Sequence, residues 1–143
     1  MADETAILRT IERYVAAGSA CDVEAIVSLF AQGATIEDPV GSGIRRGHDE
    51  IRRFFVELWA RLTSIAYRPL HIEVVGDEAA FSMEVRPVVG DQTLVMKAID
   101  VMTFNDDARI TSMRAYFRIS SLRPVPVVRD EGERVAGPTS SRS

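Results

Sequence analysis

The stretch LVMKAIDVMTF, residues 94–104, predicts a β-strand with one face in the core of the protein. Strand alternation divides it into two faces, with Met96, Ala98, Asp100, Met102 and Phe104 on one and Val95, Lys97, Ile99, Val101 and Thr103 on the other. Because Lys97 belongs in solvent, we expect Asp100 to point inward among the methionines. A carboxyl group in such surroundings either carries a large desolvation cost as an anion or stays protonated and becomes a hydrogen-bond donor.

Alternation of this kind recurs along the second half of the chain. It predicts strands over residues 67–75, 79–89, 93–104 and 109–122, with turns at 76–77, 90–91 and 105–107. Short turns between such strands are typical of an antiparallel meander. We also expect a short strand over residues 34–39, because Pro39 cannot donate to a β-ladder and holds Asp38 in extended geometry at the strand end.

Apolar residues at helical spacing predict three helices in the first half of the chain. The first covers residues 3–20 with Asp3 or Thr5 as its cap, and the third runs from Gly47 to about Leu62. The second, shorter helix begins at Asp22, presents Ile26, Leu29 and Phe30 to the core, and stops at Gly33. Helices first and strands afterwards indicate an α+β domain with helices on one side of a curved sheet.

Length and composition bound the kind of protein. The 143 residues suit one domain, which we place at residues 1–122, and the Pro-, Arg-, Gly- and Ser-rich residues 123–143 are expected to form a flexible tail. A net charge of −4 with interspersed basic residues argues against nucleic acid as a partner. No apolar run is long enough to span a membrane, no metal-ligand spacing is seen, and Cys21 is alone, so we expect a soluble, cytoplasmic protein.

The inward faces of the strands predict an apolar cavity suited to a rigid hydrophobic ligand. Its expected lining residues are Phe55, Phe81, Met83, Val85, Met96, Ala98, Met102, Met113, Ala115 and Phe117, some of which should be simple core. Three polar groups are expected to converge there, namely Tyr14, Asp38 and Asp100. Asp38 lies beside a polar, Gly-containing loop, so it can remain an anion more easily than Asp100.

Four segments together make the chain resemble the ketosteroid isomerases, the steroid Δ5-isomerases of the nuclear-transport-factor-like and SnoaL-like superfamily. They are RYV at 13–15, GATIEDPVG at 33–41, AIDVM at 98–102 and MRAYF at 113–117. The resemblance spans residues 5–120. It implies a cone-shaped fold in which the helices pack on a mixed, mostly antiparallel sheet around the pocket, and a homodimer.

The resemblance also implies a reaction and its residues. Asp38 would be the base that takes a proton from carbon 4 of a 3-oxo-Δ5-steroid and returns it to carbon 6, without cofactor or metal. Tyr14 and a protonated Asp100 would donate hydrogen bonds to the carbon 3 oxygen of the dienolate. A neutral carboxylic acid in this role is a known property of that family, so it is carried over and is not an independent prediction. Phe30 and Phe55 replace tyrosines that support the catalytic phenol in some members.

Other functions stay open at this point. The same cavity would suit a non-catalytic sterol- or lipid-binding protein, or a cyclase or hydrolase acting on another hydrophobic ring substrate. An epoxide hydrolase would be expected to show an Asp-Arg-Asp arrangement, and no arginine has inward parity on the strand that carries Asp100. The outer sheet face could pair two subunits, and its expected apolar members are Tyr67, Val95, Ile99, Val101 and Tyr116.

Overall fold

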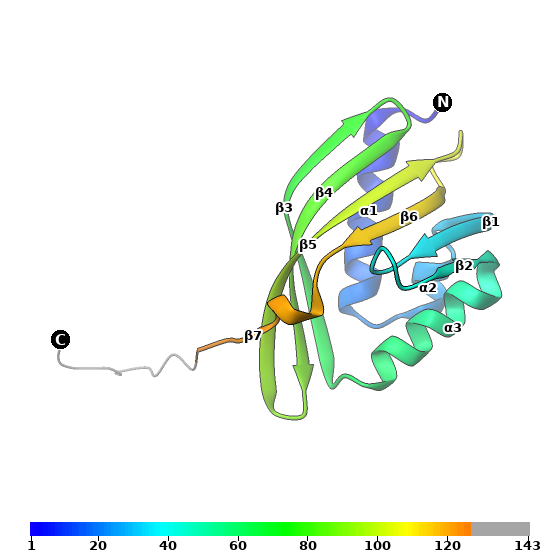
Figure 1. Cartoon of the computed structure of the whole chain (residues 1–143). Coiled ribbons are helices and arrows are strands. Elements are labelled where there is room, and N and C mark those ends of the chain that lie inside the picture. Colours follow the sequence, from blue (N-terminus) through cyan, green and yellow to red (C-terminus); the bar gives the residue numbers. More distant parts are fainter. Residues whose placement is uncertain (127–143) are drawn as a thin grey trace.

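The computed structural model describes residues 1–126, and residues 127–143 lie outside the described part. In chain order its elements are α1 (Glu4–Ser19), α2 (Val23–Val27), β1 (Phe30–Glu37), β2 (Ile44–Arg46), α3 (Gly47–Ala60), β3 (Ser64–Val75), β4 (Glu78–Val89), β5 (Gln92–Phe104), β6 (Ile110–Tyr116), the 3-10 turn η1 (Ile119–Ser121) and β7 (Arg123–Pro124). Three helices therefore precede the main run of strands, as predicted (Figure 1).

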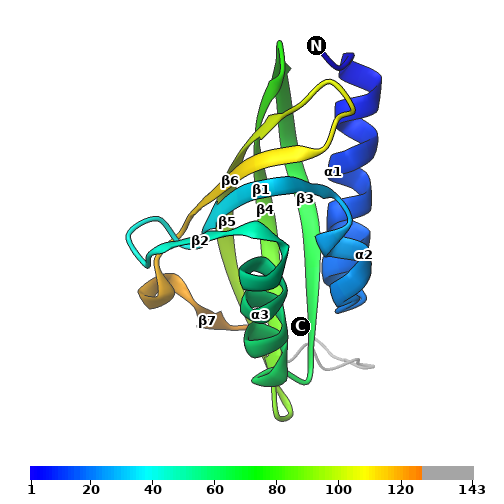
Figure 2. The same ribbon diagram turned by 90° about the vertical axis from the view of Figure 1, so that its right-hand side faces the viewer.

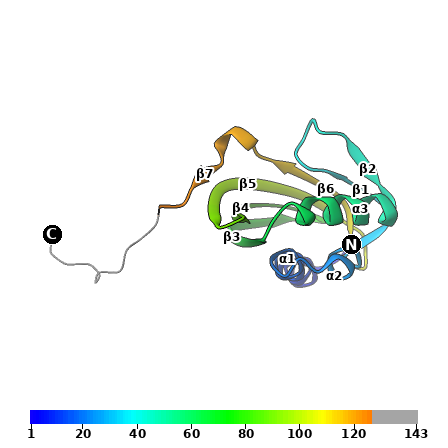
Figure 3. The ribbon, with the colours of Figure 1, turned by 90° about the horizontal axis from the view of Figure 1, so that it is seen from below.

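One curved sheet carries the fold, with strand order β2-β1-β6-β5-β4-β3. β3, β4, β5 and β6 form the predicted antiparallel meander, and β1 joins it parallel to β6. The sheet is therefore mixed but mostly antiparallel. It curls without closing into a barrel, and the helices cover its inner side (Figure 3). The predicted α+β class and cone-like architecture are confirmed.

The helices are fixed by local capping and by packing on the sheet. Asp3 accepts a hydrogen bond of 2.7 Å from the Ala6 N–H and caps α1, and Asp22 caps α2 through the Ala25 N–H at 3.1 Å. α1 runs along β3, whereas α3 lies across β1 and β2 (Figure 2). The two long helices thus pack near opposite edges of the sheet.

The prediction that the second helix extends to Phe30 is wrong. α2 ends at Val27, and Phe30 is already the first residue of β1, where it pairs with Ile110 of β6. The carbonyl oxygen of Leu29 accepts a hydrogen bond of 2.9 Å from the Ile110 N–H, so pairing with β6 replaces another turn of helix. Gly33 does not stop a helix but lies inside β1 with φ +73°, where the register between β1 and β6 shifts.

The structure also differs from the sequence prediction at the two ends of the meander. The segment after Asp38 contains a short strand, because Ile44–Arg46 pairs antiparallel with the end of β1. The last long strand ends at Tyr116, and η1 follows it. Within the segment predicted as a tail, Arg123–Pro124 pairs with Leu94 and Val95 of β5, and residues 127–143 lie outside the described part.

The predicted parity of the long strands is confirmed by burial. Asp100 is 2% exposed, Met102 is fully buried, and Ile99 on the opposite face is 49% exposed. Within residues 1–126, no helix has both the length and the apolar character needed to cross a bilayer.

Candidate active site

A cavity of about 420 Å³ lies between the helices and the inner face of the sheet, a size typical of small-molecule sites. Its lining residues are Tyr14, Asp38, Pro39, Arg45, Phe54, Glu57, Leu58, Arg61, Leu62, Ile65, Tyr67, Met83, Val85, Pro87, Met96, Ala98, Asp100, Ala115, Phe117, Ile119 and Leu122. Glu57, Arg61 and Ile119 are exposed and mark its mouth. Tyr14, Asp38 and Asp100 all line it, so the structure brings the three predicted polar residues together.

The ten residues predicted to contact a ligand divide into two groups. Six of them line the cavity, namely Met83, Val85, Met96, Ala98, Ala115 and Phe117. The other four lie in the hydrophobic core and outside the lining, namely Phe55, Phe81, Met102 and Met113. Strand parity could place every one of them except the helical Phe55 on the inner face, but it could not show how far the helices cover that face.

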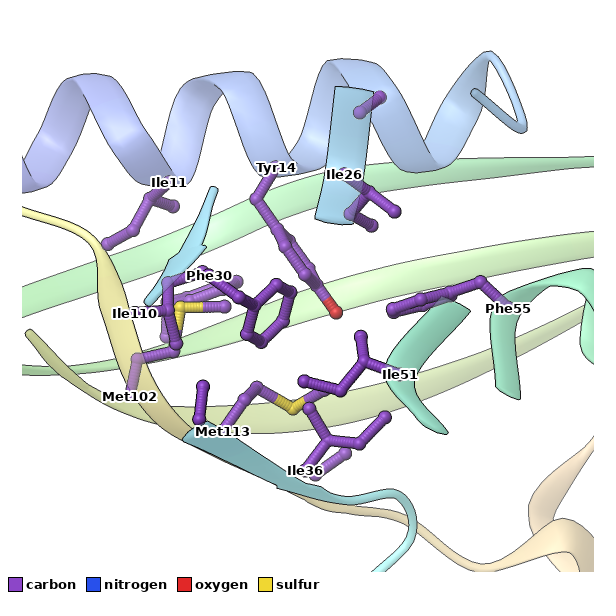
Figure 4. Close-up of a cluster of buried hydrophobic side chains, with 14 of the residues drawn as sticks. Ile11, Tyr14, Ile26, Phe30, Ile36, Ile51, Phe55, Met102, Ile110 and Met113 are labelled. Carbon is purple, nitrogen blue, oxygen red and sulfur yellow. The ribbon is translucent and has the colours of Figure 1, made fainter. Parts of the chain in front are cut away.

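Tyr14 extends from the buried side of α1 toward the space between Phe30, Ile51 and Phe55 (Figure 4). It is 3% exposed, and its ring meets Phe30 edge to face at 6.4 Å between centroids. Burial raises the pKa of the Tyr14 hydroxyl well above its usual value, and the nearby Asp100 and Asp38 raise it further. The group is therefore a neutral hydrogen-bond donor near neutral pH.

Asp100 lies in the middle of β5, between Phe81 of β4 and Ala115 of β6. Burial raises the pKa of its carboxyl group well above the usual range, and the charge of Asp38 acts in the same direction. Both effects favour the neutral acid. The apolar surroundings seen in the sequence are thus the physical cause of the shift.

Asp38 follows β1 directly and precedes a cis peptide bond to Pro39. The turn after it is held by a hydrogen bond of 2.8 Å from the Val40 N–H to the Ala115 carbonyl oxygen. Glu37 points away from the cavity, where it accepts from the Gly41 N–H at 2.9 Å and pairs with Arg114 at 3.1 Å. Of the two adjacent acids, Asp38 lines the cavity and Glu37 does not.

The pKa of Asp38 is raised from its ordinary value to about 6, mainly because of burial, while the charge of Arg45 lowers it. The two carboxyl groups of the cavity differ for this reason. Asp38 is half-buried and faces the cationic Arg45 side, whereas Asp100 is enclosed by strands. An anion at Asp38 and a neutral acid at Asp100 can therefore coexist at neutral pH.

Arg45 is a lining residue that the sequence prediction left unassigned. It belongs to β2, and its guanidinium group lies 4.6 Å from the centre of the Phe54 ring. No strand was predicted over residues 44–46, so nothing indicated that Arg45 would point toward the cavity. Its positive charge lowers the pKa of Asp38.

Tyr67 is the second lining residue that was missed, and its predicted place on the outer sheet face is wrong. Its ring covers Gly18 of α1, where an added Cβ would overlap the ring. Its backbone N–H donates to the Ser19 hydroxyl at 3.0 Å. The contact between α1 and β3 turns Tyr67 inward, and a bulge in β3 between Pro69 and His71 breaks the simple alternation used in the prediction.

The polar groups of the cavity are free to meet a ligand. Within residues 1–126, the side-chain oxygens of Tyr14, Asp38 and Asp100 form no hydrogen bond with another side chain or with the backbone. The described residues contain no group of three His, Cys, Asp or Glu side chains that could hold a metal ion. The site thus contains two neutral hydrogen-bond donors, Tyr14 and Asp100, and one carboxylate that can act as a base, Asp38, within an apolar lining.

The chain is similar in sequence to known proteins. Residues 11–113 match the model of the SnoaL-like domain. The chain belongs to the SnoaL-like family. The chain is similar to the steroid Delta-isomerase of Nocardioides simplex. The two are 40% identical over 107 residues, which cover 75% of this chain and 85% of the relative.

Solved structures agree with this membership of the SnoaL-like family. The epoxide hydrolase/cyclase-like enzyme SalBIII, described in pyran ring formation of the polyether salinomycin, superposes with a TM-score of 0.79 at 26% identity and covers 87% of this chain and 100% of its own. An LEH-like epoxide hydrolase of Mycobacterium tuberculosis gives 0.71 at 20% identity, with 82% and 86% covered, which shows the fold alone.

Proposed function

We propose that this SnoaL-like protein is a steroid Δ5-isomerase that moves the double bond of a 3-oxo-Δ5-steroid into conjugation with the ketone. The observation that carries the proposal is the sharing of one apolar cavity by an ionisable Asp38 and two neutral donors, Tyr14 and Asp100. The 40% identity to a protein named steroid Delta-isomerase supports it. No cofactor or metal takes part in the proposed reaction.

The proposed reaction has two proton transfers through one carboxylate. Asp38 takes a proton from carbon 4, and the electron pair of that C–H bond forms the 3,5-dienolate with its charge on the carbon 3 oxygen. Asp38 then returns the proton to carbon 6, the carbonyl re-forms, and the double bond lies between carbons 4 and 5. Substrate and product have the same atoms, and the base is regenerated.

Tyr14 and Asp100 act on the intermediate. Both are buried among apolar side chains and neither has a partner among the described residues, so their hydrogens are available to the enolate oxygen. Donors aimed at developing charge in a dry site strengthen as that charge grows, which lowers the barrier. Phe30 and Phe55 pack beside Tyr14 and have no hydrogen-bond donor, so neither of them donates a hydrogen bond to the Tyr14 hydroxyl oxygen.

The test is turnover of a Δ5-3-ketosteroid, followed by the ultraviolet absorbance of the conjugated product. The wild-type protein should raise this absorbance well above the buffer rate, and Asp38→Asn should lose about 10²–10⁴-fold of the rate. Asp91→Asn, in the exposed turn after β4, is a matched control. Tight steroid binding with no turnover would favour a non-catalytic binding protein, and an Asp38→Asn enzyme as fast as wild type would exclude Asp38 as the base.

Arg45 favours one alternative, the opening of an epoxide. It lines the cavity with Asp38 and Asp100. The cavity therefore contains two aspartates and an arginine, the residue types expected of an epoxide hydrolase, although the arginine does not come from the strand that carries Asp100. Against this reading, Arg45 forms no ion pair with either aspartate among the described residues and stacks on Phe54 instead. Incubation with a hydrophobic ring epoxide and analysis for the diol or cyclic ether distinguishes the two reactions.

The outer sheet face supports the proposal that two copies pair. Ile99 is 49% exposed and Tyr116 is 42% exposed, and the two are cross-strand partners on β5 and β6. An exposed apolar pair at the centre of an open sheet face suits an isologous contact. Light scattering after size exclusion should give twice the chain mass, and Ile99→Lys should give the mass of one chain.

A further inference from the structure

Trp59 and Tyr67 form an incomplete polar pair beside the cavity. Trp59 Nε1 is, among residues 1–126, the one buried side-chain polar atom without a hydrogen-bond partner, although the residue is 7% exposed. A buried N–H without a partner is costly and calls for an explanation. The candidate partner is Tyr67: burial raises the pKa of its hydroxyl well above the usual value, and hydrogen bonding with the Trp59 side chain lowers it. The two side chains are neighbours, and their contact falls outside strict hydrogen-bond geometry.

The Tyr67 hydroxyl is available to the cavity. The residue lines the cavity, and its ring is held from behind by Gly18, with the adjacent Ser19 hydroxyl bound to its backbone N–H. An indole N–H can only donate, so an approach from Trp59 uses a lone pair of the phenol oxygen and leaves its hydrogen for another acceptor. No hydrogen bond joins Tyr67 to Asp38, although the charge of Asp38 helps to raise the pKa of Tyr67.

The strand register places the backbone of Tyr67 at another level of the sheet than Asp100. Tyr67 is paired with Val85, which is paired with Met96, whereas Asp100 is paired with Phe81. Four residues along β5 separate the two levels, which corresponds to about 13 Å of strand. Ile65 and Pro87, which line the cavity beyond Tyr67, continue toward its mouth. A rigid ring ligand held at Asp100 would therefore have its remote rings near Tyr67.

We propose that Tyr67, backed by Trp59, is a second hydrogen-bonding site that binds a remote oxygen substituent of the substrate. The substrate class is then a rigid hydrophobic ring system with two oxygen functions, a reacting ketone at one end and a ketone or hydroxyl at the other. Binding of this second oxygen draws the Tyr67 hydroxyl into a defined position, in which its oxygen accepts from Trp59 Nε1. This inference rests on the proposed function for the position of the reacting ketone.

The experiment compares two phenolic steroids that differ only in a ketone at the ring remote from the phenol. The phenol mimics the enolate at Tyr14 and Asp100, so both ligands share that end. Binding to the full chain is measured by fluorescence titration for wild type, Tyr67→Phe and Tyr116→Phe. Tyr116 is exposed on the outer sheet face and serves as the matched loss of a hydroxyl.

Wild type and Tyr116→Phe should prefer the ketone-bearing ligand by about fivefold to tenfold, the effect of one hydrogen bond, and Tyr67→Phe should bring that ratio close to one. Trp59→Phe should reduce the ratio in the wild-type background and leave it unchanged in the Tyr67→Phe background. A ratio near one in wild type, or a ratio kept in Tyr67→Phe, overturns the proposal. A melting curve for each variant ensures that only folded protein is compared.

The outcomes separate this proposal from the proposed reaction. The affinity ratio needs no turnover, so a protein that fails to isomerise steroids but loses the ratio in Tyr67→Phe contradicts the reaction and supports the role of Tyr67. An active isomerase with the same ratio in wild type and Tyr67→Phe contradicts the role of Tyr67 alone.

Discussion

The N–H of Val40 donates a hydrogen bond of 2.8 Å to the carbonyl oxygen of Ala115, and Ala115 is the cross-strand partner of Asp100. The turn that carries Asp38 is therefore tied to the strand position beside the second carboxyl group. Backbone hydrogen bonds, rather than flexible side chains, set the separation between the two acids. Such a fixed arrangement is what a proton transfer next to an oxyanion site requires.

The pH dependence of kcat/KM should report Asp38. Because burial raises its pKa to about 6, the base is increasingly protonated below that pH, and kcat/KM should fall about tenfold per pH unit there. Arg45 lowers this pKa, so Arg45→Met should move the midpoint to higher pH. Arg46→Met is the control, since Arg46 is exposed and outside the cavity lining. An unchanged or lower midpoint in Arg45→Met would contradict the assignment.

Asp38→Asn should make the protein more stable at neutral pH while it removes activity. An acid whose folded pKa lies above its unfolded value binds its proton more tightly when folded, so stability falls as pH rises from about 4 to about 6. Asparagine carries no such cost. After allowance for the partial exposure of Asp38, the gain in unfolding free energy at pH 7.5 should be about 1–2 kcal/mol.

Thermal or urea unfolding of both proteins measures this gain, which should vanish below about pH 4, where folded and unfolded Asp38 are both protonated. Asp91→Asn provides the exposed control. A destabilised Asp38→Asn at pH 7.5 would mean that Asp38 has a stabilising partner that the structure does not contain.

Tyr14→Phe should lower kcat by about 10²–10³-fold, the usual effect of removing one donor from an oxyanion site. Its unfolding free energy should stay close to that of wild type, because the hydroxyl has no partner among the described residues. Tyr116→Phe should leave kcat unchanged. Steady-state kinetics with matched melting curves makes the comparison, and equal losses in the two variants would remove Tyr14 from the site.

Asp100 should tolerate a neutral donor better than an apolar group. Asp100→Leu should lose about 10²–10³-fold in kcat, whereas Asp100→Asn keeps an N–H donor and should lose less. The reason is that burial already raises the pKa of Asp100 and favours its neutral form. If the two variants lose the same activity, donation by Asp100 is not what matters.

The effect of Gly18→Ala on the free energy of unfolding should change sign with the residue at position 67. In the wild-type background the new methyl group overlaps the Tyr67 ring, so the substitution should cost about 1–3 kcal/mol of unfolding free energy. In a Tyr67→Ala background the overlap is gone, and alanine should stabilise α1 by about 0.5–1 kcal/mol relative to glycine. Urea unfolding of the four proteins of this cycle gives both values, and the same sign in both backgrounds would contradict the contact.

Much of the fold was predictable because period-two alternation survives in the long strands. Met96, Ala98 and Asp100 face inward as β5 parity requires, and the two helix caps at Asp3 and Asp22 follow from local chemistry. The three polar residues of the cavity were recognised through family motifs, and alternation alone would have identified one of them, Asp100.

The remaining features depend on pairings between distant segments. Phe30 continues a helical pattern in sequence, and only its pairing with Ile110 shows that it is a strand residue. Tyr67 has outward parity in the simple strand pattern, but the β3 bulge and the contact with Gly18 turn it inward. Arg45 reaches the cavity because a three-residue strand adds to the edge of β1. Local periodicity carries no information on such contacts.

The parallel pairing of β1 with β6 has a consequence for the order of folding. β1 ends next to Asp38 and is flanked in the sheet only by β2 and β6, so its inner edge has no strand to join until residues 110–116 exist. On the ribosome, the helices and the antiparallel pair β1–β2 can form while the chain is still short, since their contacts are local. The base and the two donors can come together only after residues 110–116 have been synthesised. Truncated chains should therefore acquire helical structure well before they acquire the ability to bind a ligand.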